Sequence, residues 1–325
     1  MLRTFAFLWC STLAAGDLGL LQRLSDNNRF FELRRTLKQP GWNSDETLFY
    51  QALVAVRFGQ ETSGIALLQQ VLQSQPSPAI ARKVHEEIAS AFERIGRYKE
   101  AAQELTQALL LTPEQDPERP ENANTQLLMA SLSDVAPETV EYGAGDVPIR
   151  ATRNRLGSWD VPVQVNGAQG QWIFDTGAGL STLTESEAKR MGLSVLETKT
   201  YVRGSTGQKN TLRLAVAGDL QFGSARLHNV VFLVLTDAAL AIGPLHYQIT
   251  GILGLPVLRA LHRVGISSDG AIGIQPRETA SEEMPNLYFD DESSIVEISH
   301  AGHRLQMFLD TGANDTTLYP SFRKP

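Results

Sequence analysis

The sequence contains almost no cysteine, no dense patch of basic residues and no long apolar run. Cys10 is the single cysteine among 325 residues, which excludes an intrachain disulfide and a metal site built from cysteines. The net charge of −7 argues against a nucleic-acid partner. The apolar runs are shorter than the roughly 20 residues that a membrane-spanning helix needs, so we expect no membrane span. The length predicts a globular protein of more than one domain, because one domain takes roughly 100–200 residues.

Several motifs that carry chemistry in other enzyme classes are also missing. The sequence has no G-x-S-x-G, no H-E-x-x-H and no phosphate-cradling glycine loop, which argues against the enzyme classes that depend on them. His300 and His303 have a spacing that could suggest metal binding, but no third ligand lies near them in the sequence. We interpret both as surface residues, and we expect neither a metal nor another cofactor.

The first 16 residues have the order of a secretory signal. Arg3 precedes an apolar run over residues 4–13, and small residues follow at 14–16. This order predicts a signal peptide over residues 1–16 and export to the periplasm or out of the cell. The alternative is a buried first helix, in which case the protein is cytoplasmic.

Residues 17–113 show helical periodicity and an internal repeat. Gly59 and Gly96 are 37 residues apart, and two prolines and two alanines keep the same offset. The second copy resembles a tetratricopeptide repeat in its small, aromatic and Gly-x-Tyr positions. Such helical stacks present a concave surface to a protein partner, and a plain spacer is the alternative of equal weight. Residues 114–157 are rich in Pro, Glu and Asn, and we expect a linker with at most one short helix.

The pattern changes to short alternating strands after the expected linker. Residues 161–165 alternate apolar and polar side chains, and the Asn-Gly pair that follows is a strong signal for a tight hairpin turn. A second apolar stretch then leads into Asp175. We therefore expect a β lobe over residues 158–279, in which a hairpin delivers this aspartate to a turn.

One phrase occurs twice in the sequence: two apolar residues followed by D-T-G-A, at 173–178 and at 308–313. Asp175 and Asp310 are 135 residues apart, and the same offset relates the alternating strand at 295–298 to the strand of the first copy. The repeat therefore includes the supporting hairpin as well as the motif. Duplication of a lobe is the interpretation that we favour.

With the segment G-I-L-G-L-P-V-L at 251–258, these motifs make the sequence similar to the retropepsin/pepsin superfamily of aspartic peptidases, in its bacterial retropepsin-like form. The resemblance implies an all-β acid-protease lobe and the start of a second lobe, which, with the N-terminal helical repeat, make a multidomain α + β protein. It also implies a catalytic dyad of Asp175 and Asp310 that activates water to hydrolyse a peptide bond in a peptide or protein substrate. The implied turn and flap residues are Thr176, Gly177, Ala178, Thr311, Gly312 and Ala313 for the two catalytic turns, and Gly204, Ser205, Thr206 and Gly207 for the flap.

Both copies carry alanine after the D-T-G triplet. Many acid-acting relatives have Ser or Thr there, and its hydroxyl group bonds the carboxylate and lowers its pKa. Ala178 and Ala313 cannot supply that hydrogen bond. We therefore predict a pH optimum less acidic than that of pepsin-like enzymes.

Only 15 residues follow Asp310, whereas the first copy uses 76 residues between Asp175 and Gly251. We therefore expect residues 285–325 to be the start of a second lobe that is truncated in this sequence. Three alternatives stay open. The chain is a fragment of a longer two-lobed enzyme, or two copies form a homodimer with an Asp175–Asp175 dyad, or the lobe is inactive and serves as a peptide-binding adaptor.

Overall fold

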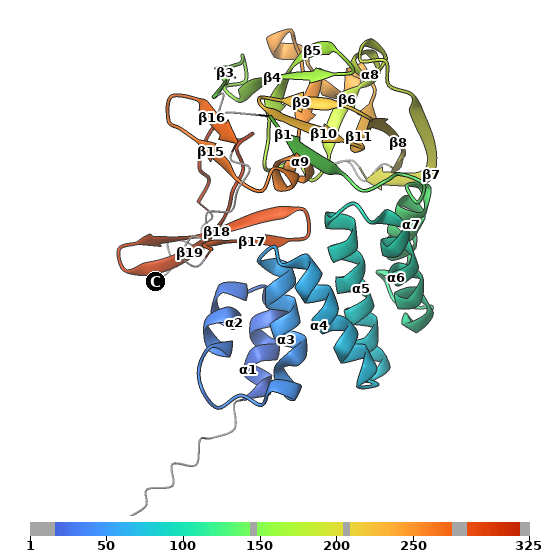
Figure 1. Ribbon diagram of the computed structural model, residues 1–325, viewed down its shortest axis with the longest axis vertical. Coiled ribbons are helices and arrows are strands. Elements are labelled where there is room, and N and C mark those ends of the chain that lie inside the picture. The colour runs from blue at the N-terminus through green and yellow to red at the C-terminus, as the bar shows by residue number, and fades with distance from the viewer. Residues whose placement is uncertain (1–16, 144–147, 204–208, 275–284, 319–325) are drawn as a thin grey trace, which may run out of the picture.

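The computed structural model describes residues 17–143, 148–203, 209–274 and 285–318 (Figure 1). Within these residues, no helix has both the length and the apolar character needed to cross a bilayer. The predicted signal peptide and the four flap candidates, Gly204 to Gly207, lie outside the described residues.

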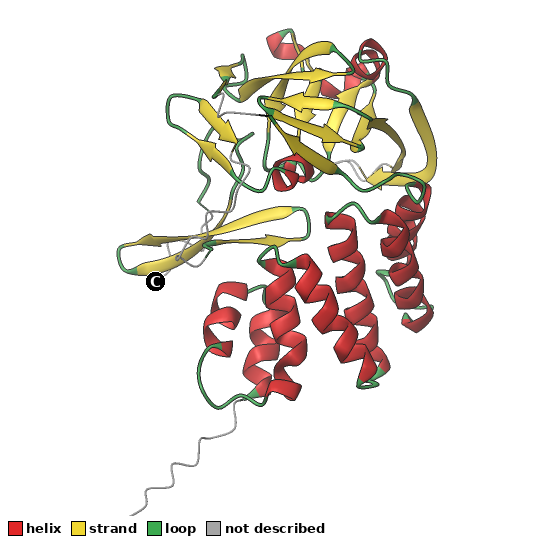
Figure 2. Ribbon diagram, in the orientation of Figure 1, coloured by secondary structure: helices red, strands yellow, loops and turns green. Residues whose placement is uncertain are grey.

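The N-terminal part is a stack of antiparallel helices, which we call the helical domain, as the sequence predicts (Figure 2). Gly59 and Gly96, the repeat glycines, follow the ends of two helices and have positive φ angles of 78° and 70°. That backbone conformation favours glycine, so the repeated glycines mark equivalent helix ends. The helices are α1 (Leu18–Asp26), α2 (Phe30–Leu37), α3 (Ser44–Arg57), α4 (Glu61–Gln73), α5 (Pro78–Arg94), α6 (Tyr98–Leu111) and α7 (Arg119–Ser131).

The segment expected to be a linker, 114–157, is largely structured. It contains α7, whose Met129 joins the apolar core of the preceding helices, and a strand that extends the sheet of the β lobe. Asn124 of α7 also donates a hydrogen bond to the carbonyl of Tyr201 in the β lobe and accepts one from its N–H. The Pro- and Asn-rich composition hid these elements, because their support comes from the neighbouring domains and not from a strong local pattern.

The β lobe is built on one strongly curved sheet of eleven strands within the described residues. Its order is β1-β10-β9-β4-β5-β14-β6-β11-β8-β7, and β3 pairs with β4. The strands are β1 (Thr139–Tyr142), β3 (Thr152–Arg153), β4 (Trp159–Val165), β5 (Ala168–Phe174), β6 (Ser181–Thr184), β7 (Val195–Arg203), β8 (Lys209–Ala217), β9 (Leu220–Phe222), β10 (Ala225–His228), β11 (Val230–Leu235) and β14 (Gly251–Leu253). The smaller elements are β2 (Ile149–Arg150), β15 (Val264–Ile266) and β16 (Ala271–Ile274), the pair β12 (Ala241–Ile242) and β13 (Tyr247–Gln248), the helices α8 (Glu185–Arg190) and α9 (Leu255–Ala260), and 3-10 turns at Asp237–Leu240 and Gly243–Leu245.

The hairpin β4–β5 carries the first aspartate and closes at Asn166 and Gly167. Both residues have positive φ angles, 49° and 84°, as a two-residue primed turn requires. Trp172 and Phe174 of β5 are fully buried in the core of the lobe. The indole N–H of Trp172 donates to the carboxylate of Glu187 (2.8 Å), so its polar atom is satisfied within the core.

The second copy of the motif belongs to a separate three-stranded antiparallel sheet, which we call the C-terminal sheet: β17 (Leu287–Asp290), β18 (Ser293–His300) and β19 (His303–Phe308). In Figure 1 this sheet, drawn in orange-red, lies between the helical domain and the β lobe. Its β18–β19 hairpin closes at Ala301 and Gly302, which again have positive φ angles. The local plan of the first copy is therefore repeated, but no strand of the large sheet pairs with it among the described residues.

Candidate active site

Asp175 follows directly after β5 and is held from below by β14. Its N–H donates to the carbonyl of Leu253 (3.1 Å), and the N–H of Leu255 donates to the carbonyl of Ala178 (2.9 Å). Between them, Gly254 passes so close to the turn that a Cβ there would lie 2.8 Å from the carbonyl oxygen of Ala178. The G-I-L-G segment thus threads beneath the turn, and only glycine fits at the crossing.

Asp310 lies just beyond β19 in the C-terminal sheet, with Leu309 between them. The residue before it, Leu309, donates its N–H to the carbonyl of Ser294 (2.8 Å). The Ser294 hydroxyl, which is buried, donates back to the Leu309 carbonyl (3.2 Å). The strand end that presents Asp310 is therefore fixed by β18, as β14 fixes the strand end before Asp175.

The two threonines of the motifs join the two turns in a reciprocal network. The Thr176 N–H donates to Thr311 Oγ1 (3.0 Å), and the Thr311 N–H donates to Thr176 Oγ1 (3.0 Å). The Thr176 hydroxyl donates to the Leu309 carbonyl (2.7 Å), and the Thr311 hydroxyl donates to the Phe174 carbonyl (3.0 Å). Each threonine thus binds the strand that carries the other aspartate, and the arrangement has local twofold symmetry.

The two glycines bring each turn against the carboxylate of the other. A Cβ on Gly177 would lie 2.7 Å from Cγ of Asp310, and a Cβ on Gly312 would lie 2.6 Å from Cγ of Asp175. Within each turn the glycine N–H donates to its own aspartate, at 2.8 Å for Gly177 and 2.9 Å for Gly312. The N–H of Ala313 donates a further bond to Asp310 (3.0 Å). The two carboxylates therefore share one site within a single chain.

Burial and the neighbouring carboxylate raise the pKa of Asp175. Desolvation is the largest cause, and the negative charge and hydrogen bond of Asp310 add to it. The N–H groups of Gly177 and Gly312 act in the opposite direction, because they stabilise the ionised form. The raised pKa of Asp175 therefore depends in part on the carboxylate of Asp310 beside it.

Two residues that the sequence analysis did not single out complete the support of the second turn. The Ser158 hydroxyl donates to the carbonyl of Gly312 (3.0 Å), and the Asn314 side-chain amide donates to the carbonyl of Leu156. Both contacts join the loop before β4 to the turn after β19. Asn314 directly follows D-T-G-A, but nothing in the sequence pattern marks Ser158 as its neighbour.

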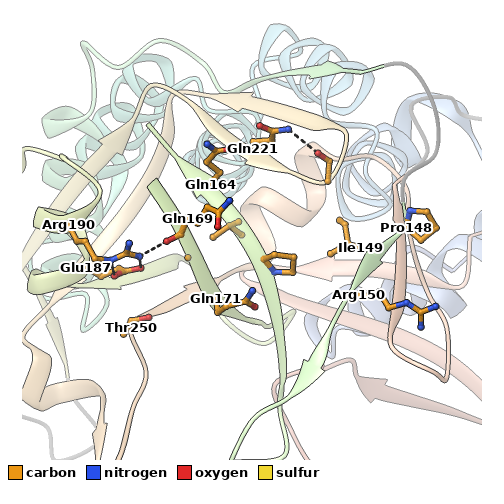
Figure 3. A pocket seen from close by; sticks show the side chains of 14 residues that line it. Pro148, Ile149, Arg150, Gln164, Gln169, Gln171, Glu187, Arg190, Gln221 and Thr250 are labelled. Atoms are coloured by element: carbon orange, nitrogen blue, oxygen red, sulfur yellow. Dashed lines mark hydrogen bonds and ion pairs between the residues drawn. The ribbon is translucent and has the colours of Figure 1, made fainter. Parts of the chain in front are cut away.

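The remaining candidates lie apart from the dyad. His300 and His303 face each other at the exposed end of the β18–β19 hairpin, and the described residues hold no group of three metal-binding side chains. A hollow of about 810 Å³ opens on the outer face of β4 and β5, and the dyad residues do not line it. Figure 3 shows Gln164, Gln169 and Gln171 around this hollow, with Arg190 bonded to the carbonyl of Gln169.

Comparison with known proteins bears on the same part of the chain. Residues 161–257 match the aspartyl protease family. The matched segment runs from β4 through Asp175 and the G-I-L-G segment, and it ends before Asp310. Thirty-one chains of solved structures match the protein. One is a retropepsin-like aspartic protease from Rickettsia conorii, with 23% sequence identity and a TM-score of 0.31, covering 42% of this chain and 93% of that chain. No curated protein matches.

Proposed function

We propose that the protein is an aspartic endopeptidase whose catalytic dyad is Asp175 and Asp310 of one chain. The observation that carries the proposal is the reciprocal hydrogen bonding of Thr176 and Thr311, which brings the two D-T-G-A turns face to face. The match of residues 161–257 to aspartyl proteases supports the same reaction class.

The dyad would hydrolyse a peptide bond through a water molecule bound between the carboxylates. One ionised carboxylate takes a proton from the water as general base, and the protonated partner donates to the carbonyl oxygen as general acid. The raised pKa of Asp175, caused in part by the neighbouring Asp310, supports a pair that works with one shared proton. The backbone N–H groups of Gly177 and Gly312 then stabilise whichever carboxylate is ionised.

The pH optimum is expected to be less acidic than that of pepsin-like enzymes. Ala178 and Ala313 supply no side-chain hydroxyl to either carboxylate, and the pKa of Asp175 is raised from its ordinary value. Because the dyad works with one proton, a higher pKa moves the activity range to higher pH. A pH–rate profile of the purified protein that peaks well below pH 4 would contradict this.

The decisive experiment replaces each aspartate separately with asparagine and measures pepstatin-sensitive cleavage of a denatured protein substrate. Both Asp175→Asn and Asp310→Asn are expected to lose roughly 10²–10⁴-fold in kcat/KM, the usual contribution of general acid–base catalysis. Asp134→Asn, an exposed change in the loop after α7, serves as the matched control.

The outcomes separate the alternatives. Activity that survives Asp310→Asn but not Asp175→Asn would refute the intramolecular dyad and point to an Asp175–Asp175 homodimer. Activity that survives both changes would refute the protease and leave a peptide-binding adaptor. We also propose, from the sequence patterns alone, that the protein is exported and that its tetratricopeptide-like helices bind a protein partner.

A further inference from the structure

The C-terminal sheet has an apolar face that packs on the helical domain. Tyr288 of β17 is 2% exposed, and its ring meets Phe30 and Phe31 of α2 edge-on, with centroids 5.3 and 5.1 Å away. Its hydroxyl donates to the carbonyl of Asn28 (2.7 Å), at the turn before α2. Ile295 of β18 packs against the same cluster. The strand therefore supplies part of the core of the first helices.

Charged pairs fix the register of this contact. Arg35 of α2 forms a two-pronged ion pair with Glu297 of β18, with N–O distances of 2.9 and 3.0 Å. The Glu297 side chain is 14% exposed, so water screens this pair less than an ordinary surface pair. At the other end of the sheet, Asn28 donates to Asp290 (2.8 Å). Paired polar groups of this kind permit one alignment of strand on helix and disfavour others.

The β17–β18 turn inserts into a charged junction between the helices and the β lobe. Arg57 at the end of α3 is buried and faces Asp290 and Asp291 at 3.8 and 3.5 Å, and it pairs with Glu87 of α5 at 2.8 Å. Arg259 of the β-lobe helix α9 stacks over Phe289 (4.3 Å to the ring centroid) and pairs with Glu61 of α4 (2.6 Å). All three parts of the molecule thus meet at this turn.

The two aspartates are therefore supported differently. Asp175 rests on β14, a strand of its own lobe that runs under its turn. Asp310 meets the β lobe at its turn and the flanking residues, through the threonine network, Ser158 and Asn314. Behind that turn, β17 and β18 lie against α2 and α3, and the β lobe reaches them through Arg259 over Phe289. Figure 1 shows the C-terminal sheet along the top of these helices, with the β lobe on its other side.

We infer that the helical domain positions the second catalytic aspartate, by holding the C-terminal sheet on α2 and α3 so that the Asp310 turn meets Asp175. The inference rests on the proposed function for the role of Asp310 and extends it, because it gives the helices a part in the active site. Arg35, Tyr288 and Arg57 are positioning residues in this scheme, since none of them touches the dyad.

A charge reversal at the Arg35–Glu297 pair tests the inference. Arg35→Glu sets two carboxylates against each other and should loosen the sheet, lowering kcat/KM roughly 10- to 100-fold, as expected for breaking a partly buried ion pair. The double variant Arg35→Glu/Glu297→Arg restores the pair in reverse and should recover part of that loss, because Arg304, which also pairs with Glu297 (3.1 Å), then faces a like charge. Arg82→Glu is the matched control, because Arg82 pairs with Glu86 and Asp116 inside the helical domain, away from the sheet.

Two readouts distinguish positioning from general damage. Loosening the sheet removes the charge and hydrogen bond of Asp310 that raise the pKa of Asp175, so the alkaline limb of the pH–rate profile should move to lower pH. Amide hydrogen exchange over residues 303–313 of the full chain should accelerate in Arg35→Glu, while exchange in α5 and α6 stays unchanged. Tyr288→Phe removes the hydroxyl that bonds the Asn28 carbonyl and the Gln306 side chain but keeps the ring. It should show the same changes to a smaller degree, and it serves as the test variant if Arg35→Glu does not fold.

The hydrogen-exchange measurement keeps the inference separate from the proposed function. If the wild-type protein cleaves no peptide, faster exchange at 303–313 in Arg35→Glu, reversed in the double variant, still supports positioning by the helices. If Arg35→Glu and Tyr288→Phe match Arg82→Glu in kcat/KM, pH profile and exchange at 303–313, the helical domain does not position Asp310 and the inference is overturned.

Discussion

Replacing Thr176 with valine isolates the hydrogen bonds that join the two turns. Valine has nearly the same shape, so the packing of this 8%-exposed residue is kept while its hydroxyl is removed. The change deletes the bond donated to the Leu309 carbonyl (2.7 Å) and the bond accepted from the Thr311 N–H (3.0 Å). Both lost partners belong to the backbone of the Asp310 turn.

The expected cost follows from these two bonds. Each contributes about 0.5–1.5 kcal/mol net, and leaving a backbone group unsatisfied in a partly buried site costs about 1–3 kcal/mol. Two bonds give about 1–3 kcal/mol and two fully unsatisfied groups give about 2–6 kcal/mol, so we take about 2–4 kcal/mol for docking of the Asp310 turn, because the site stays partly open to water. Since about 1.4 kcal/mol corresponds to a factor of ten, the population of the docked turn should fall about 30- to 900-fold relative to the undocked turn.

The assay is kcat/KM for pepstatin-sensitive cleavage, together with the affinity for pepstatin. The activity that Thr176→Val loses should follow the fraction of molecules whose Asp310 turn is undocked. Thr176→Ser keeps the hydroxyl and should retain most of the wild-type activity. Thr106→Val removes a hydroxyl that bonds the Ala102 carbonyl within α6, and it controls for the chemical change alone. Thr176→Val activity within about threefold of wild type would refute the argument that the threonine network sets the dyad.

Three further outcomes follow from the same geometry. Gly312→Ala should abolish measurable activity while the far-ultraviolet circular dichroism spectrum is preserved, because its Cβ would lie 2.6 Å from Cγ of Asp175 and displace that carboxylate. Gly254→Ala should lower the melting temperature of the β lobe in calorimetry, because its Cβ would meet backbone atoms 2.8 Å away. Burial, with the charge of Glu292, raises the pKa of Glu93 from 4.5 to about 7. This carboxyl thus holds its proton more tightly in the folded state, and stability falls as pH rises from about 4.5 to 7, by at most on the order of 3 kcal/mol. Glu93→Gln should therefore stabilise the protein at pH 8 and leave it nearly unchanged at pH 4, measured by urea unfolding, and equal effects at both pH values would contradict the assignment.

The hairpins and helix ends could be predicted because their signals are local. The Asn166-Gly167 turn follows β4, whose alternation matches its buried and exposed faces, and the repeat glycines mark two helix ends. A turn residue fixes its own φ, and the alternation of a strand fixes its own face, so neither needs the rest of the chain. The expectation for 114–157 allowed one helix, which α7 provides, but it missed β1, because this strand is stabilised by β10, far from it in the sequence.

By itself, the sequence determined the two D-T-G-A turns, the hairpins that carry them and the segment that threads under the first. Only the tertiary structure decided how the second turn is supported. Arg35 and Glu297 are 262 residues apart, and no periodicity or turn signal relates residues at that separation. Their contact depends on the packing of Tyr288 among the helices and on the burial of the charges around it, which are properties of the folded chain. The second aspartate, recognised from its motif, reaches the first because helices at the other end of the chain support the sheet that carries it.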